Sequence, residues 1–174
     1  MTELEAEIAR LIREYQAKTG KLLTIGTVES ATGGRIADRI TNVAGSSDYF
    51  KGSVVAYSNE VKIAVLRIKK TTIENYGAVS EQTALEMAQG GRNLLHVDIC
   101  VSDTGIAGPS GATPEKPVGL FYLGLAARGE SLSQKHVFPG NREENKRDAT
   151  EAALSMLKQY LLRCVGAKGR SARL

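Results

Sequence analysis

The sequence predicts a single α/β domain of three layers, in which helices cover both faces of a mixed, mostly parallel central sheet. Two observations predict this α/β/α class. Short apolar runs alternate along the chain with longer stretches of helical periodicity, which is the order expected of strands joined by helices. In addition, 18 of the 174 residues are glycine, tryptophan is absent and aromatic residues make up only 5%, a composition that favours tight turns over an all-β sandwich.

The first half of the chain contains most of the predicted helices. Residues 2–18 keep apolar side chains at helical spacing, and Thr2 with Glu5 forms a predicted capping box. Ser80 is the predicted N-cap of a longer helix. The expected elements are, in order, a helix over 2–18, a strand over 22–28, a helix through 36–40, a strand over 52–57, and helices over 60–66, 72–76 and 80–95.

The second half predicts three strands and a final helix. A strand over 97–102 leads into a Gly/Pro-rich loop over 105–117, and strands over 118–126 and 131–138 follow. The first three strands should be largely parallel, whereas the last two, joined by a short turn at 128–130, should form a hairpin. Asn141, with Glu144 three residues later, predicts a capping box at the start of the last helix.

Charge and composition limit the kind of protein. With 42% hydrophobic and 24% charged residues the chain can bury a core, which excludes a disordered protein. The formal charge is +4, but residues 1–140 carry fifteen basic and fifteen acidic side chains, so no nucleic-acid footprint is expected there. We expect one domain over 1–165 and a basic, flexible tail over 166–174. No apolar run is long enough to cross a bilayer and the first residues are acidic, so we expect a cytoplasmic protein.

The first candidate site is the segment Glu29-Ser30-Ala31-Thr32-Gly33-Gly34, which follows the first strand. The carboxyl edge of a parallel sheet is where α/β proteins bind ligands. A serine at that edge, followed by glycines that open a helix, places its hydroxyl beside free backbone N–H groups that can hold a phosphate or an oxyanion. The alternative is an ordinary helix N-cap with a tight glycine turn.

The second candidate is Tyr57-Ser58-Asn59-Glu60-Val61-Lys62, at the end of the second strand. If Ser58 or Asn59 caps the next helix, Lys62 falls at its third or fourth position, where the helix dipole lowers the pKa of a lysine. A neutral lysine can take a proton from a serine. The alternative is a surface lysine on an amphipathic helix.

The third candidate is Asp103-Thr104-Gly105-Ile106-Ala107-Gly108-Pro109, continuing to Pro117-Val118-Gly119. Such a loop offers backbone donors and allows close approach to a ligand, although a plain connector is also possible. The two histidines, His96 and His136, are remote in sequence from all three segments. We expect neither a metal nor a cofactor, because no His/Asp/Glu cluster suggests a metal site, and Cys100 and Cys164 have no CxxC spacing.

Six ordered motifs together resemble the C-terminal domain family of the competence-damage protein CinA. The resemblance spans about residues 4 to 160, and the chain is similar to the stand-alone form, without the molybdopterin-binding-like N-terminal domain of the family. The motifs are the 29–34 segment, Gly45-Ser46-Ser47, the 57–62 segment, Gly77-Ala78-Val79-Ser80-Glu81, Thr104-Gly105-Ile106-Ala107-Gly108-Pro109 and Pro114-Glu115-Lys116-Pro117-Val118-Gly119.

The resemblance implies nicotinamide-nucleotide amidase activity, the hydrolysis of nicotinamide mononucleotide to nicotinate mononucleotide and ammonia, a step of pyridine-nucleotide salvage. It assigns Ser30 as nucleophile, Lys62 as general base and Tyr57 as a proton-relay or orienting partner. It also suggests a homodimer, with a small-molecule nucleotide as ligand. The charge balance and the lack of a long apolar run give no reason to expect nucleic acid or a membrane as partner.

Supporting roles are expected for other residues of the same motifs. Thr32 and the amides of Gly33 and Gly34 could stabilise an oxyanion, while Thr104 and Gly105 could line the nicotinamide site. Arg142 is a candidate for the ligand phosphate, which a guanidinium can grip through two hydrogen bonds. Glu29, Ser47 and Asn59 complete the expected substrate-binding set.

Two residues depart from the family pattern. Ala31 stands where the family usually has cysteine, and Asp103 replaces a residue that is more often apolar or small. Asp103 could repel a substrate phosphate, bind the ribose or tie down Lys62. Two other functions stay open: a non-catalytic pyridine-nucleotide-binding regulatory module, and a DNA-associated competence factor, which the neutral charge of residues 1–140 disfavours.

Overall fold

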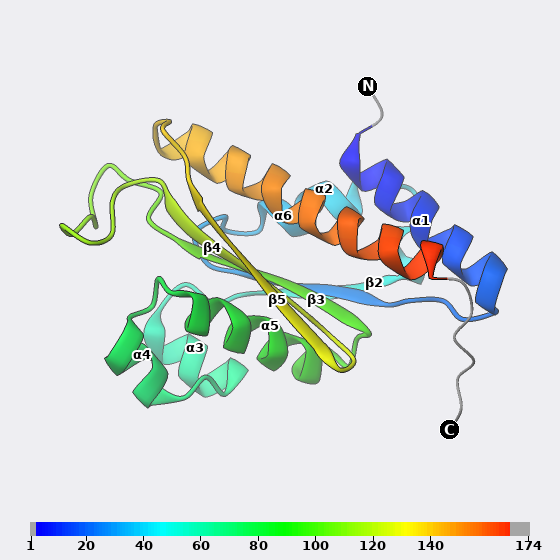
Figure 1. The fold of residues 1–174 in the computed structure, drawn as a ribbon, viewed down its shortest axis with the longest axis horizontal. Coiled ribbons are helices and arrows are strands. Elements are labelled where there is room, and N and C mark those ends of the chain that lie inside the picture. Colours follow the sequence, from blue (N-terminus) through cyan, green and yellow to red (C-terminus); the bar gives the residue numbers. More distant parts are fainter. Residues whose placement is uncertain (1–2, 168–174) are drawn as a thin grey trace.

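The computed structural model describes residues 3–167 and forms a three-layer α/β/α sandwich around one five-stranded sheet (Figure 1). Both the predicted fold class and the predicted order of helices and strands are confirmed. The elements are α1 (Leu4–Thr19), β1 (Ile25–Glu29), α2 (Arg35–Thr41), the 3-10 helix η1 (Ser46–Asp48), β2 (Phe50–Val55), α3 (Asn59–Leu66), α4 (Lys70–Tyr76), α5 (Glu81–Leu95), β3 (Ile99–Gly105), β4 (Leu120–Ala127), β5 (Glu130–Val137) and α6 (Arg142–Gly166).

The sheet is mixed, with strand order β2-β1-β3-β4-β5. β1 pairs in parallel with β2 on one side and with β3 on the other, whereas β4 runs antiparallel to both β3 and β5. The predicted parallel strands and the predicted hairpin are therefore both confirmed. Because the chain leaves β1 toward one neighbour and later returns to the other, the carboxyl ends of β1 and β3 form a topological switch point.

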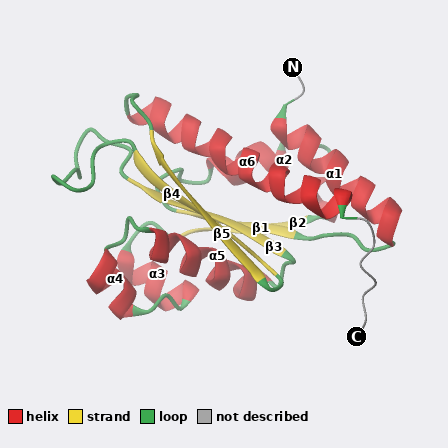
Figure 2. Ribbon diagram, viewed as in Figure 1, coloured by secondary structure: helices red, strands yellow, loops and turns green. Residues whose placement is uncertain are grey.

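Two apolar layers hold the helices on the sheet, as the red helices on either side of the yellow strands show (Figure 2). α1, α2 and α6 cover one face through a large cluster that includes Ile8, Ile36, Val101 and Leu154. α3, α4 and α5 lie on the other face, where Met87 packs with residues such as Val28 and Cys100.

The strand boundaries differ from those predicted at two places that bear on the site. β1 begins at Ile25 rather than at residue 22, because the amide of Thr24 donates to the carboxylate of Asp98 (2.9 Å) instead of to a strand. β3 continues to Gly105, past the predicted end at residue 102, since its pairing with β4 extends to Gly105 opposite Phe121. Asp103 and Thr104 therefore lie inside the sheet and not in the loop.

The predicted caps can also be compared with the structure. Ser80 caps α5, and Asn141 with Glu144 forms the capping box of α6, both as predicted. The N-cap of α1 is Glu3, without a side-chain cap, and Glu5 is paired with Arg39 (2.6 Å). Thr2, the other half of the capping box predicted there, lies outside the described residues, as do residues 168–174 of the predicted tail.

Candidate functional site

A pocket of about 240 Å³ opens at the switch point, where the segments that follow β1, β2 and β3 meet. All three candidate segments of the sequence contribute to its wall. The residues that line it are Ser30, Ala31, Tyr57, Asn59, Lys62, Ala78, Val79, Thr104, Gly105, Ile106, Ala107, Gly108, Ser110, Gly111 and Arg142.

Hydrogen bonds of the backbone fix the position of Ser30 in the turn after β1. Its side chain is nearly buried, and its amide donates to Oδ1 of Asp103 on β3 (3.0 Å). The amide of Thr32 donates to Oδ2 of the same carboxyl group (3.1 Å), and the Thr32 hydroxyl also contacts Oδ1. Asp103 thus fixes the turn on both sides of Ala31.

Glu29 fixes the glycine turn that connects Ser30 to α2. The buried Glu29 carboxylate accepts hydrogen bonds from the amides of Gly34 (2.8 Å), Ile36 (3.0 Å) and Ala37 (2.8 Å), so it satisfies the free N–H groups of the first turn. Gly33 and Gly34 have φ angles of +68° and +99°, which explains why the sequence needs glycine at both positions.

Lys62 approaches Ser30 from α3. Ser58 is the N-cap, since its hydroxyl accepts from the amide of Val61 (3.3 Å), and Lys62 is consequently the fourth residue of the helix. The lysine is 2% exposed, which rules out the surface-lysine interpretation. Its Nζ lies 3.0 Å from Ser30 Oγ, 2.8 Å from the carbonyl oxygen of Ala56 and 3.3 Å from that of Tyr57.

The electrostatics of the pair favour a neutral lysine. Burial lowers the pKa of Lys62, while the charge of Asp103 opposes this by raising it. A neutral amine has two hydrogens and one lone pair; the hydrogens can go to the two backbone carbonyls, which leaves the lone pair for the Ser30 hydroxyl proton. This is the arrangement a general base requires.

Asp103 neither lines the pocket, where it could bind a ribose, nor forms a hydrogen bond with Lys62. It is fully buried, and its oxygens are occupied by the Ser30–Thr32 turn rather than facing the pocket. Its influence on Lys62 is through charge only. Burial raises the pKa of Asp103 to about 6, and the nearby charge of Glu29 raises it as well, against the lowering effect of the hydrogen bonds.

Tyr57 and Arg142 form the outer rim of the pocket. The Tyr57 side chain is 62% exposed, and its hydroxyl accepts a hydrogen bond from Nη2 of Arg142 (3.1 Å). Nη1 of Arg142 donates to the carbonyl of Gly108 (2.8 Å). The hydroxyl of Tyr57 thus orients Arg142, and it is the backbone carbonyl of Tyr57, not its hydroxyl, that contacts Lys62.

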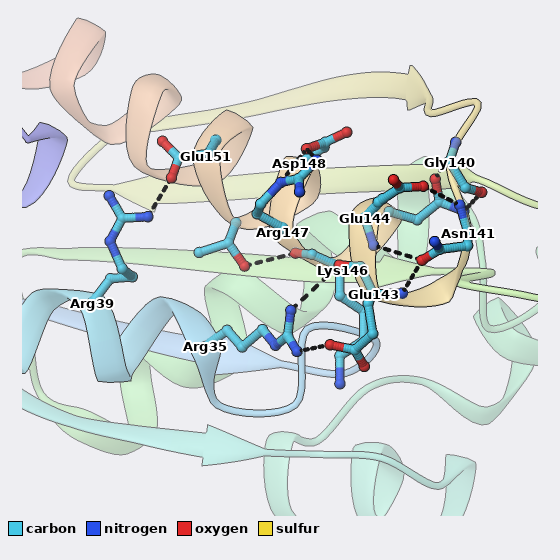
Figure 3. A network of polar contacts seen from close by, with 12 residues as sticks. Arg35, Arg39, Gly140, Asn141, Glu143, Glu144, Lys146, Arg147, Asp148 and Glu151 are labelled. Carbon is cyan, nitrogen blue, oxygen red and sulfur yellow. Dashed lines mark hydrogen bonds and ion pairs between the residues drawn. The ribbon is translucent and has the colours of Figure 1, made fainter.

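A network of polar contacts fixes the start of α6, the helix whose first residue is Arg142 (Figure 3). Asn141 accepts from the amides of Glu143 (2.9 Å) and Glu144 (3.1 Å), and the Glu144 carboxylate accepts from the amide of Asn141 (2.8 Å). Arg35, the first residue of α2, forms an ion pair with Glu143. The helix that follows the serine turn and the helix that carries Arg142 are therefore tied together.

Several residues expected to bind substrate are not brought into the pocket wall. Glu29, Thr32, Gly33 and Gly34 support the serine turn from behind. The Thr32 and Gly34 amides already donate to Asp103 and Glu29, so they are not free for the expected oxyanion role. Ser47 is an exposed residue of η1, which precedes β2, and so lies toward the opposite end of the parallel strands.

Sequence reasoning missed one wall of the pocket. Ala78 and Val79, in the turn before α5, face the ligand space. The Thr104 hydroxyl donates to the carbonyl of Ala78 (2.7 Å), and Nζ of Lys116 donates to the carbonyls of Tyr76 and Val79 (both 2.7 Å). The motif around Gly77 was visible in the sequence, but its contact with Lys116 joins residues about 40 positions apart.

Two negative findings apply to residues 3–167. That part of the chain has no group of three or more His, Cys, Asp and Glu side chains that could hold a metal ion. None of its helices combines the length and the apolar character needed to cross a membrane.

The fold and the pocket define a three-layer α/β protein with a buried serine–lysine pair at the switch point of its sheet. The sequence model of the CinA C-terminal domain matches residues 2–161. The chain therefore belongs to the CinA C-terminal domain family, and the resemblance noted from the motifs is confirmed.

Relatives and solved structures agree with this assignment. The chain is 52% identical over 161 residues to a putative competence-damage inducible protein of Halothermothrix orenii and 48% identical over 159 residues to a CinA-like protein of Kosmotoga olearia. These matches cover 92% and 91% of this chain but 38% and 37% of the relatives, so the chain spans little more than a third of their length.

The similar solved structures are matched over nearly their whole length. The competence/damage inducible protein of Agrobacterium tumefaciens is 36% identical with a TM-score of 0.83, over 93% of this chain and 97% of that one. A CinA superfamily protein of Klebsiella pneumoniae is 28% identical with a TM-score of 0.83, over 93% of this chain and 99% of that one.

Proposed function

We propose that the chain is a nicotinamide-nucleotide amidase that hydrolyses nicotinamide mononucleotide to nicotinate mononucleotide and ammonia. The observation that carries the proposal is the 3.0 Å contact between the buried Lys62 Nζ and Ser30 Oγ, in a pocket whose rim bears Arg142. A serine activated by a neutral lysine is suited to acyl transfer from an amide. A rim arginine is suited to a phosphate.

The reaction would proceed in two halves. Ser30 Oγ attacks the carboxamide carbon and passes its proton to Lys62. The tetrahedral intermediate then expels ammonia, which takes that proton from Lys62, and a nicotinoyl ester of Ser30 remains. In the second half Lys62 deprotonates a water molecule that attacks the ester, and nicotinate mononucleotide leaves as Ser30 regains its proton.

The oxyanion needs a donor at the pocket wall, and Thr32, Gly33 and Gly34 do not line the pocket. The amide of Ser30 is bound to Asp103, and those of Thr32 and Gly34 are bound to Asp103 and Glu29. Ala31 lines the pocket next to the nucleophile, and its amide donates to no acceptor among the described residues. We assign the Ala31 amide to the oxyanion, because backbone N–H groups beside the nucleophile are the usual donors.

The pocket wall carries groups suited to both ends of the nucleotide. Ala78, Val79 and Ile106 supply apolar side chains suited to the pyridine ring. At the rim, Arg142 uses one donor on Gly108 and one on Tyr57, and the guanidinium has five, so donors are left for a phosphate.

Ammonia release from nicotinamide mononucleotide, measured across pH, tests the proposal. Ser30→Ala should lose turnover by roughly 10³-fold or more while still binding the nucleotide. Ser110→Ala is the matched control, because Ser110 also lines the pocket but contacts neither Lys62 nor Asp103 in the described structure. Binding without ammonia release by the unmodified protein would contradict the amidase and favour a non-catalytic pyridine-nucleotide-binding module.

A further inference from the structure

Behind the serine turn, two buried carboxyl groups meet at a single hydroxyl. Oγ of Thr32 lies 2.7 Å from Oε2 of Glu29 and is also in hydrogen-bond contact with Oδ1 of Asp103. All three side chains are at most 1% exposed. The cluster lies outside the pocket wall, and the proposed reaction uses none of its atoms directly.

The number of protons in this cluster is constrained. A threonine hydroxyl has one hydrogen to donate, whereas ionised carboxylates only accept. If both carboxyl groups were ionised, Thr32 could donate to one of them, and its oxygen would face the lone pairs of the other. Two satisfied hydrogen bonds therefore require one more proton, carried by one of the two acids.

The surroundings identify which acid carries it. Glu29 accepts from three backbone amides of the α2 turn and lies within hydrogen-bond distance of Thr27 Oγ (3.3 Å) and Ser53 Oγ (3.5 Å), so its environment stabilises an anion. Asp103 accepts two amides and faces the charge of Glu29. A protonated Asp103 can still accept those two amides while its O–H donates to Thr32.

The structure assigns the extra proton to Asp103, in a chain that runs from the Asp103 carboxyl through the Thr32 hydroxyl to the Glu29 carboxylate. Asp103 is thus a positioning residue for the serine turn, and its own protonation is set by Thr32 and Glu29. Its effect on turnover rests on the proposed amidase function, but the proton chain itself does not.

Other charged groups face the cluster from the neighbouring elements. α3 contributes Lys62, and α6 contributes Lys146, whose ammonium is 3.6 Å from the place of a Cβ on Gly33. On β4 the residue opposite Asp103 is Leu123, which is apolar. Loss of the Asp103 proton would place a second negative charge beside Glu29, and the attraction of Lys62 for its own proton would rise.

The proton can be observed directly by ¹³C NMR of the side-chain carboxyl carbons in the labelled full chain, titrated from about pH 4 to 8. The Asp103 signal, identified by its loss in Asp103→Asn, should report a protonated acid at pH values where exposed aspartates, with pKa values of about 3.9, are ionised. An Asp103 that titrates like an exposed aspartate would overturn the inference.

A matched pair of variants tests whether the Thr32 hydroxyl connects the two carboxyl groups. Thr32→Val removes the hydroxyl to which the protonated Asp103 donates, and should shift the Asp103 titration to lower pH, because the neutral acid loses its acceptor. Thr27→Val removes another fully buried hydroxyl that contacts Glu29, and should leave the titration unchanged. Equal shifts, or none in Thr32→Val, would overturn the bridging role.

Hydrogen exchange gives a readout that needs neither activity nor Thr32→Val. In Asp103→Asn the new NH₂ group must face one of the two backbone amides, so either Ser30 or Thr32 loses its acceptor. Exchange of that amide should accelerate roughly tenfold or more relative to the unmodified chain. Unchanged exchange at both amides would contradict the positioning role, even if the amidase proposal held.

Discussion

Lys62 Nζ lies 3.0 Å from Ser30 Oγ, and both of its other hydrogen-bond partners are backbone carbonyls. The lysine is therefore buried without an ion-pair partner among the described residues, although burying an ammonium is costly. The chain tolerates this cost at a position where a neutral amine is chemically useful. Perturbed ionisation of this kind is concentrated at functional sites.

This burial predicts a pH dependence of stability. A lysine whose pKa is lower in the folded state than its unfolded value of about 10.4 destabilises the fold below the folded pKa, and the penalty disappears as pH rises toward the unfolded value. The free energy of unfolding of the unmodified chain should therefore rise, relative to Lys62→Met, across this alkaline window. Urea denaturation at a series of pH values measures the difference.

Lys62→Met also loses the hydrogen bonds of Lys62, which lowers its free energy of unfolding by a similar amount at every pH. This loss does not change how the difference between the two proteins depends on pH. Lys70→Met, on the exposed face of α4, is the control and should follow the unmodified chain at every pH. A difference between Lys62→Met and the unmodified chain that stayed constant through the alkaline range would show that the lysine is not perturbed.

A second prediction concerns the charge of Asp103. Above a pH of about 6 this carboxyl is ionised, and its charge raises the pKa of Lys62. Asp103→Asn removes that charge, so the rise of kcat/KM with pH that reports deprotonation of Lys62 should move to lower pH. The maximal rate should fall, because the serine turn loses an acceptor.

The pH profile of ammonia release separates these two effects of the substitution. Asp38→Asn, which changes an exposed carboxylate on α2, is the control. It should change neither the pH at which kcat/KM rises nor the maximal rate. If this rise in Asp103→Asn stayed at the same pH or moved to higher pH, the electrostatic link between Asp103 and Lys62 would be wrong.

The order of the elements could be predicted because it depends on local signals. Apolar periodicity, the N-caps Ser58 and Ser80 and the capping box at Asn141 all act within a few residues, and the structure has all of them. The segments that carry Ser30 and Lys62 could be singled out because both follow parallel strands, whose carboxyl ends meet at one edge, and the family resemblance then paired the two residues.

The remaining features of the site depend on contacts that no local pattern specifies. Asp103 binds amides 71 and 73 residues away, and Arg142 meets the Tyr57 hydroxyl across 85 residues. The extension of β3 to Gly105 is determined by its partner β4, so Asp103 was expected in a loop. Ser47, in a similar Gly/Ser-rich segment, precedes a strand instead of following one.

A third prediction separates the two roles of Tyr57. Because its hydroxyl contacts Arg142 and its carbonyl contacts Lys62, Tyr57→Phe should raise KM for nicotinamide mononucleotide several-fold with little change in kcat. Tyr76→Phe, another exposed tyrosine, is the control. A loss confined to kcat would instead support a proton relay through the hydroxyl.

Arg142→Met extends this test to the phosphate. Charge-assisted hydrogen bonds contribute about 1.5–3 kcal/mol each, so KM for the nucleotide should rise by roughly ten- to a hundredfold. With nicotinamide riboside, which lacks the phosphate, the unmodified chain and the variant should behave alike. An equal loss with both substrates would mean that Arg142 supports the pocket wall through Gly108 rather than binding phosphate.

The last prediction concerns the packing that carries Ser30 to the pocket. Gly91 of α5 lies against β1, and a Cβ at this position would be 2.1 Å from Cγ2 of Val28 and 2.8 Å from Sγ of Cys100. Gly91→Ala should therefore destabilise the fold by about 1–3 kcal/mol in chemical denaturation, although alanine is the better helix former.

Gly166→Ala provides the matched comparison, because that glycine is also helical and no atom of residues 3–167 lies within 4 Å of its Cβ position. It should be neutral or stabilising by up to about 1 kcal/mol. Val28 is two residues before Ser30. If the added methyl group in Gly91→Ala pushes β1 away from α5, the distance between Ser30 and Lys62 should also increase and kcat should fall. If Gly91→Ala were as harmless as Gly166→Ala, the close approach of α5 to β1 would not be what fixes the end of that strand.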